Sequence, residues 1–273
     1  MIAGIDFDHL AVAAARRSDL ERRYAGELGA TYVTSGQTAG LYATIVRFAN
    51  GVKLEAIEPY DMEHDDFLAR FLVRHGPGFH HITFVVPDVD AAAAVTEAQG
   101  YQLLGSRTTH LTEVFLHPKQ ALGVVVQYIE RRNYQGAAPP GFPAGPAPAD
   151  FDHLALVVAS LDAGRAVFVD LLGGRESAPG EGERSRWVDL SWSGPGRIRL
   201  LEPAAGSPLR AWLGERAGAV HHLAIGLDDP SAVPGAEPVG EGAWEVAPQH
   251  NFGVRLRLRT RRPGGSTRTG SQI

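Results

Sequence analysis

The segment FDHLAVAA at residues 7–14 returns almost letter for letter as FDHLALVV at residues 151–158. Two further segments have the same design, FHHITFVV at 79–86 and VHHLAIGL at 220–227. Each carries a histidine at its third position, and these histidines recur at intervals of 72, 72 and 69 residues: His9, His81, His153 and His222. A fixed period of this kind indicates an internal repeat. We therefore predict four copies of one structural unit.

Each copy is predicted to open with a strand, continue with a helix and close on strands. The stretch after the second opening segment, DVDAAAAVTEAQG at 88–100, begins with a capping acid and ends with glycine, as helices do. The closing segments are also alike: GVKLEAIEP at 51–59, GVVVQYIE at 123–130, GRIRLLEP at 196–203 and GVRLRLRT at 253–260. Their alignment places Glu55, Gln127, Arg199 and Arg257 at equivalent positions. The predicted fold is α+β, with four βαβββ modules paired into two domains.

Five prolines lie between Glu130 and Phe151, and such a segment is typical of a stiff linker. We expect a first domain at residues 1–131, a linker at 132–149 and a second domain at 150–262. The basic, Gly/Ser-rich remainder, 263–273, is predicted to be disordered.

The composition narrows the classes of function. A hydrophobic content of 44% with 21% charged residues is that of a soluble globular protein. No segment has the roughly 20 apolar residues that span a bilayer, and the start of the chain lacks the pattern of a signal peptide, so we predict a cytoplasmic protein without a membrane partner. A net charge of -5 argues against nucleic-acid binding. With no cysteine, a metal would be held by histidine, carboxylate or amide groups.

Three stretches carry a likeness to a known family: residues 54–86, LEAIEPYDMEHDDFLARFLVRHGPGFHHITFVV; residues 115–130, FLHPKQALGVVVQYIE; and residues 200–225, LLEPAAGSPLRAWLGERAGAVHHLAI. The chain resembles the vicinal oxygen chelate superfamily of glyoxalases, bleomycin resistance proteins and dioxygenases, locally most like methylmalonyl-CoA epimerase. The resemblance implies that paired copies fold a sheet around a cavity. A metal inside it would be held by residues from the first and last strand of each copy.

Carried onto this chain, the resemblance implies a metal site in the first domain formed by His9, Glu55, His81 and Gln127. Two imidazoles and a carboxylate suit Zn, Fe, Mn, Co or Ni. Because side chains alternate along a strand, Glu55 should face the cavity with Lys53 and Ile57. The same count places His81 on the cavity face and His80 on the packed face with Ile82 and Phe84.

Gln127 departs from the family pattern, in which glutamate is common at this place and also carries protons. The catalytic candidates are therefore Glu55, Gln127, His110 and Glu113, with metal-bound hydroxide as another base. The carboxylate ligand comes from the first copy, whereas extradiol dioxygenases take theirs from the second. This disfavours oxygen activation.

In the second domain the equivalent positions hold Arg199 and Arg257. Arginine has no lone pair to donate and repels a cation, so no metal is expected there. We predict a strongly basic cavity face, which could bind an anion such as phosphate or a carboxylate through Arg199 and Arg257. The alternative, slightly favoured, is that the charges are neutralised internally, for instance by Asp189, and that this domain supports the first domain or a dimer.

The leading hypothesis is a metal-dependent glyoxalase- or epimerase-type enzyme. It would perform isomerase or lyase chemistry through a metal-chelated enediolate or enolate of a small oxygenated anionic metabolite. The alternatives are a non-catalytic ligand-binding or resistance protein of the same fold and, less favoured, an extradiol-type dioxygenase. A homodimer is left open.

Overall fold

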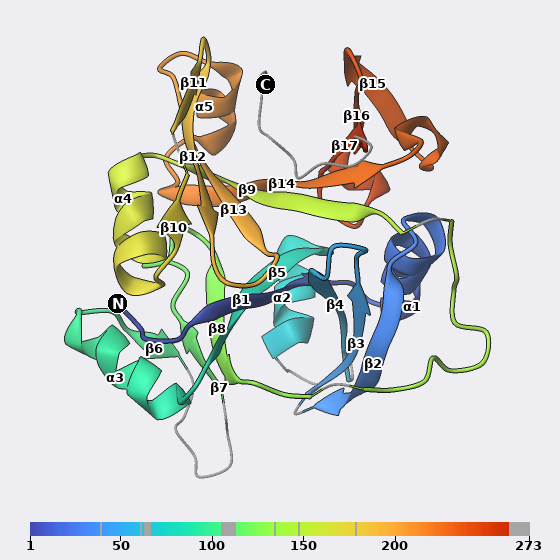
Figure 1. The fold of residues 1–273 in the computed structure, drawn as a ribbon, viewed down its shortest axis with the longest axis horizontal. Coiled ribbons are helices and arrows are strands. Elements are labelled where there is room, and N and C mark those ends of the chain that lie inside the picture. Colours follow the sequence, from blue (N-terminus) through green and yellow to red (C-terminus); the bar gives the residue numbers. More distant parts are fainter. Residues whose placement is uncertain are drawn as a thin grey trace.

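The computed structural model describes residues 1–38, 40–60, 62, 67–104, 113–133, 135–146, 148–177 and 179–261. Its strands form two mixed sheets, one from each half of the chain (Figure 1). Among the described residues, no helix is long and apolar enough to cross a membrane. The predicted tail at 263–273 lies outside the described residues.

The first sheet brings the opening and closing strands of two copies to its centre. Its strands are β1 (Asp6–Ala13), β2 (Thr31–Thr38), β3 (Leu41–Arg47), β4 (Lys53–Pro59), β5 (Gly78–Val86), β6 (Leu103–Leu104), β7 (Glu113–Leu116) and β8 (Val125–Glu130), in the order β2-β3-β4-β1-β5-β8-β7-β6. β1 and β5 pair antiparallel, and each also pairs in parallel with the last strand of its own copy, β4 or β8. The four predicted ligand positions therefore lie on four adjacent strands.

The second sheet repeats this arrangement. It contains β9 (Asp150–Val158), β10 (Arg175–Glu176), β12 (Ser185–Ser191), β13 (Arg197–Pro203), β14 (Gly218–Leu227), β15 (Ala236–Gly240), β16 (Ala243–Val246) and β17 (Leu256–Thr260), with β11 (Gly180–Gly182) paired to β12. β9 and β14 are central and antiparallel, flanked by the parallel partners β13 and β17. The predicted α+β fold of paired repeats is confirmed.

The helices follow the repeat in three copies and depart from it in the fourth. They are α1 (Arg17–Glu21) continued by η1 (Arg22–Glu27), α3 (Val89–Ala98), and α4 (Leu161–Arg165) continued by η2 (Ala166–Leu171). Asp88 caps α3, its Oδ1 accepting a hydrogen bond from the Ala91 amide at 2.9 Å. In the fourth copy the expected helix is reduced to a 3₁₀ turn, η3 (Pro230–Ala232). This turn begins at Pro230, and Pro234 follows it shortly afterwards; proline disrupts a continuing helix.

Two helices between copies, which the repeat pattern does not predict, lie on the inner faces of the sheets. Leu68 and Leu72 of α2 (Phe67–His75) pack on a cluster that includes Ala11 and Ile57 of the first sheet. Leu213 of α5 (Pro208–Leu213) packs in the same way on the second sheet. The opposite faces of both sheets contribute to one continuous hydrophobic core, which includes Leu54 of β4.

The domains meet through reciprocal contacts. Asn50, in the turn before β4, donates from Nδ2 to the Phe151 carbonyl at 2.6 Å. At the equivalent place on the other side, the Gly194 amide donates to Asp6 Oδ1 at 2.9 Å. The rings of Phe48 and Phe151 lie 5.9 Å apart between centroids, and those of Phe7 and Trp192 lie 6.2 Å apart. These matched pairs indicate pseudo-twofold symmetry between the domains.

Gly123 is expected to be required where the domains touch. Its φ is +81°, and a Cβ there would lie 2.4 Å from the Gly218 carbonyl oxygen. Gly100 is a matched control because its φ is +84° and a Cβ would meet nothing within 4 Å. Both alanine variants lose the left-handed freedom of glycine. Gly123→Ala should lower the free energy of unfolding by about 1–3 kcal/mol more than Gly100→Ala in urea titrations. Equal losses would show that this close approach is unimportant.

Candidate metal centre

Three of the four predicted ligands gather on the inner face of the first sheet. Nε2 of His9 lies 3.5 Å from Oε2 of Glu55, and Nε2 of His81 lies 3.6 Å from the same oxygen. One potential ligand atom from each residue falls within 4.8 Å of the others. His9 comes from β1, Glu55 from β4 and His81 from β5, so three neighbouring strands position one cluster.

The cluster meets the chemical requirements of a divalent metal site. The Nε2 atoms of His9 and His81 are buried and have no hydrogen-bond partner among the described residues. Burying an unpaired polar atom is costly, whereas coordination of a metal would satisfy both nitrogens. Ligand atoms about 2.1 Å from a tetrahedral ion stand roughly 3.4 Å apart, close to the separations found here. Two imidazoles and a carboxylate therefore fit such an ion.

Each histidine is held through its other ring nitrogen. Nδ1 of His9 lies 2.7 Å from Oδ2 of Asp8, whose Oδ1 accepts from Lys53 Nζ at 2.7 Å. Nδ1 of His81 lies 2.7 Å from Nδ1 of His80. Such contacts fix the orientation of histidine rings and would leave each Nε2 available to coordinate an ion. Asp8, Lys53 and His80 were not predicted to support the ligands, although the recurring Asp-His and His-His pairs were a signal in the sequence.

The predicted position of His80 on the packed face is wrong. Its ring lies 4.8 Å from that of Phe71 on α2, the helix that covers the inner face. The cause is a register shift in the pairing of β1 with β5, where Ala11 is opposite His81 but the next residue, Val12, is opposite Phe79. This bulge interrupts the period-two alternation at His80. The assignments of Glu55 and His81 to the inner face are unaffected, since Glu55 is directly opposite Ala11.

Gln127 joins a polar chain beside the cluster. Its Oε1 accepts from Thr83 Oγ1 at 2.6 Å, and its Nε2 donates to Glu113 Oε2 at 2.9 Å. The Phe115 ring, on the strand of Glu113, lies 6.4 Å from that of His81. Glu113 thus lies on the inner face, where a hydrogen bond links it to Gln127. The fourth catalytic candidate, His110, lies outside the described residues.

The protonation states differ between the two histidines. Burial disfavours charge on His9, but hydrogen bonding to Asp8 and the nearby Glu55 carboxylate outweigh it and raise its pKa to about 9. Burial lowers the pKa of His81 well below its ordinary value, and the neighbouring His80 and His9 act in the same direction. Burial raises the pKa of Glu113. His81 is therefore a neutral imidazole, the form that coordinates metals.

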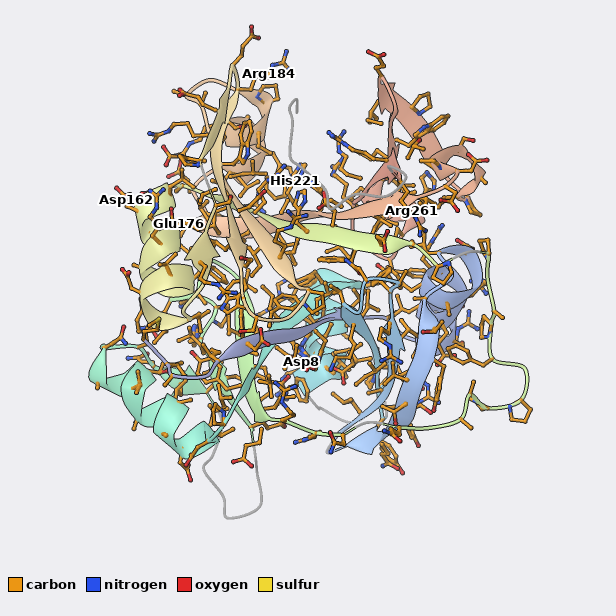
Figure 2. All side chains as sticks on the ribbon, in the orientation of Figure 1. Asp8, Asp162, Glu176, Arg184, His221 and Arg261 are labelled. Carbon is orange, nitrogen blue, oxygen red and sulfur yellow. The ribbon has the colours of Figure 1, made fainter. Side chains whose placement is uncertain are left out.

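The second domain keeps the histidine framework of the first. The rings of His153 and His222 lie 5.8 Å apart at 69°, against 6.0 Å and 67° for His9 and His81. Asp152 lies 3.1 Å from Nδ1 of His153, and His221 lies 2.8 Å from Nδ1 of His222. Figure 2 shows Asp8 among the strands of the first sheet and His221 among those of the second. At the four aligned positions, the two domains therefore differ at those of Glu55 and Gln127, which the second domain fills with Arg199 and Arg257.

Strand register confirms that Arg199 replaces Glu55 and Arg257 replaces Gln127. Arg199 is opposite Ala155 as Glu55 is opposite Ala11. Arg257 is opposite Ala224 as Gln127 is opposite Thr83. The sequence alignment had predicted both equivalences.

Each arginine has an acidic partner directly across from it on the neighbouring strand. Asp189 receives two hydrogen bonds from Arg199, at 2.6 and 2.9 Å. Glu245 pairs with Arg257 at 2.9 Å and also with Arg255. The first domain has Ile45 and Phe115 at these two places. The acids opposite the arginines compensate part of their charge, and Asp189 pairs with Arg199 as the alternative of internal neutralisation expected. Anion binding by Arg199 and Arg257 stays a prediction.

Comparisons with known proteins agree with this fold. Residues 8–113 match the family model of the Glyoxalase/Bleomycin resistance protein/Dioxygenase superfamily. A mutant 4-hydroxymandelate synthase from Streptomyces coelicolor is similar over 97% of this chain and 94% of its own, with a TM-score of 0.67 and 16% identity. Methylmalonyl-CoA epimerase from Mycobacterium tuberculosis is similar over 46% of this chain and 88% of its own, with a TM-score of 0.42 and 25% identity.

No curated protein sequence matches the chain. The family match confirms the resemblance that the sequence suggested, and the hydroxymandelate synthase comparison shows that the fold extends over both domains. Residues 8–113, in the first domain, therefore match the glyoxalase/bleomycin resistance protein/dioxygenase superfamily, the vicinal oxygen chelate proteins that the sequence resembles.

Proposed function

We propose that the first domain is a metal-dependent enzyme of the glyoxalase or epimerase type, acting on a small oxygenated anionic metabolite by isomerase or lyase chemistry. The superfamily includes metal-dependent epimerases and dioxygenases. The observation that carries the proposal is the pair of buried Nε2 atoms, on His9 and His81, that lack hydrogen-bond partners and lie 3.5 and 3.6 Å from one Glu55 oxygen.

His9, Glu55 and His81 would hold the ion, with the Gln127 amide oxygen as a weaker fourth ligand. Thr83 already donates to that oxygen, which retains its second lone pair. A divalent ion supplies Lewis acidity, which stabilises negative charge on chelated oxygens of an enediolate- or enolate-like substrate.

Glu113 is the residue best placed to carry the proton. Burial raises the pKa of its carboxyl group, which favours proton exchange nearer neutral pH than an exposed glutamate allows. Its hydrogen bond from Gln127 Nε2 holds the carboxylate beside the cluster. Glu55, in contrast, is committed to the two histidines. Gln127 would thus orient the proton carrier at the place where related sites commonly have glutamate.

Elemental analysis of two double variants tests the proposal. Wild-type protein should contain about one divalent metal per chain, and His9→Ala/His81→Ala should contain none. His153→Ala/His222→Ala, which removes the matching histidines of the second domain, should keep the metal. Circular dichroism would check that both variants fold.

If wild-type protein is folded and metal-free but binds small molecules, the enzyme proposal is rejected in favour of the ligand-binding alternative. Iron with oxygen uptake on catechols would instead support a dioxygenase. A homodimer and a cytoplasmic location stay predictions.

A further inference from the structure

A small cleft of about 210 Å³ lies where β3 ends and β4 begins. Its lining consists of Val33, Gly51 and five polar residues: Arg47, Lys53, Arg132, Asn133 and Gln135. Among the described residues, no acidic side chain lines it. Figure 1 shows the segment after β8, which supplies the last three of these residues, running past the first sheet towards β9. Residues of the linker and of β3 and β4 together thus form a basic pocket.

Strand register places this pocket on the metal-binding face. Arg47 is directly opposite Lys53, and the next pair on the same face is Ile45 with Glu55. Two residues along a strand correspond to about 7 Å. A group bound between Arg47 and Lys53 would therefore lie roughly 7 Å from the Glu55 position, within the reach of one small molecule.

The charges of the pocket are only partly compensated. Lys53 Nζ lies 2.7 Å from Asp8 Oδ1, and that carboxylate also holds His9. Arg132 lies close enough to Glu113 to favour its charged form. The exposed Arg47 guanidinium has no ion-pair partner among the residues that the structure describes. The pocket therefore favours an anion.

The second domain does not repeat the strand pair that begins this pocket. Opposite Arg197, the equivalent of Lys53, stands Ser191 in place of an arginine. Arg197 itself pairs with Asp152, as Lys53 pairs with Asp8. The additional cation, Arg47, therefore occurs only in the domain whose cluster keeps its carboxylate ligand.

We propose that this pocket binds the carboxylate or phosphate group of the substrate, held by Arg47, Lys53 and Arg132. The cleft of about 210 Å³ has room for such a group with a few waters. Guanidinium groups suit both anions because they donate two parallel hydrogen bonds. The assignment of the anion to the substrate rests on the proposed function. Under this assignment, the substrate is an acid whose anionic group lies about 7 Å from the oxygens that reach the cluster.

Calorimetric titration with inorganic phosphate and with succinate tests the pocket directly. Wild-type protein is used metal-loaded and after removal of metal by a chelator, because phosphate could otherwise bind a metal. Saturable millimolar or tighter binding of either anion is expected in both forms. Arg47→Gln/Arg132→Gln should weaken it at least tenfold. Arg131→Gln, which removes one positive charge next to the pocket without lining it, should change it less than twofold.

Failure to bind either anion, or equal weakening by Arg131→Gln and the double variant, would overturn the pocket. The relative strength of phosphate and succinate identifies which anion it prefers. Metal content separates the two proposals. A double variant with full metal and unchanged anion binding refutes only the pocket, whereas metal-free wild-type protein refutes the proposed enzyme and leaves the anion titration valid.

Discussion

Glu55→Arg is expected to abolish metal binding by the first domain. The change installs the residue that the second domain has at the equivalent position, Arg199. A divalent ion and a unit charge about 4 Å apart interact by about 8 kcal/mol at an effective dielectric constant near 20. Replacing this attraction by repulsion lowers the affinity by more than about 10⁵-fold. The metal content measured by elemental analysis should therefore fall from one ion per chain to none.

The control for Glu55→Arg is the pairing found in the second domain. Ile45→Asp/Glu55→Arg recreates the Asp189–Arg199 pair, so this double variant should be more stable than Glu55→Arg alone while remaining metal-free. Glu55→Gln, which keeps an oxygen ligand, should bind metal weakly. Stoichiometric metal in Glu55→Arg would show that Glu55 is not a ligand.

The reciprocal change is expected to give the second domain a metal site. Asp189→Ile/Arg199→Glu/Glu245→Phe/Arg257→Gln restores the first domain's residues at the four exchanged positions. The histidine rings already have nearly the same separation and angle as those of the first domain. The metal content should rise from one to two per chain in elemental analysis.

A fifth substitution and a single variant test this reciprocal prediction. Adding His153→Ala should return the content to one per chain. Arg199→Glu alone should gain no metal and lose about 3–5 kcal/mol in the free energy of unfolding, because Asp189, which is 5% exposed, would lose its partner and face a second carboxylate. A quadruple variant that folds with one metal per chain would mean that the exchanged residues do not decide metal binding.

The sequence predicted the features that depend on repetition. Four histidine-bearing strands and four closing segments were enough to align Glu55 with Arg199 and Gln127 with Arg257, and strand register confirms both. Alternation along β4 placed Glu55 on the inner face, because no bulge interrupts that strand's pairing with β1.

Features that depend on tertiary contact were not predictable in this way. The bulge at His80 reverses the face that period two assigns, and nothing local marks it. The helix expected in the fourth copy is shortened by proline, although the repeat suggested a full helix. Glu245 was missed as the partner of Arg257 because it belongs to a separate strand, β16, whose register emerges only in the folded sheet.

The paired exchange in the second domain bears on its history. Replacing Arg199 by glutamate in one step leaves the Asp189 carboxylate without its ion-pair partner. Replacing Asp189 first leaves the Arg199 guanidinium without its partner. In both cases an unpaired charge remains in a site largely closed to water. A lineage that has acquired both members of such a pair meets a destabilised intermediate on every single-step return. Under the proposed function, a metal site lost from the second domain would thus be hard to regain, even though that domain keeps the histidine framework.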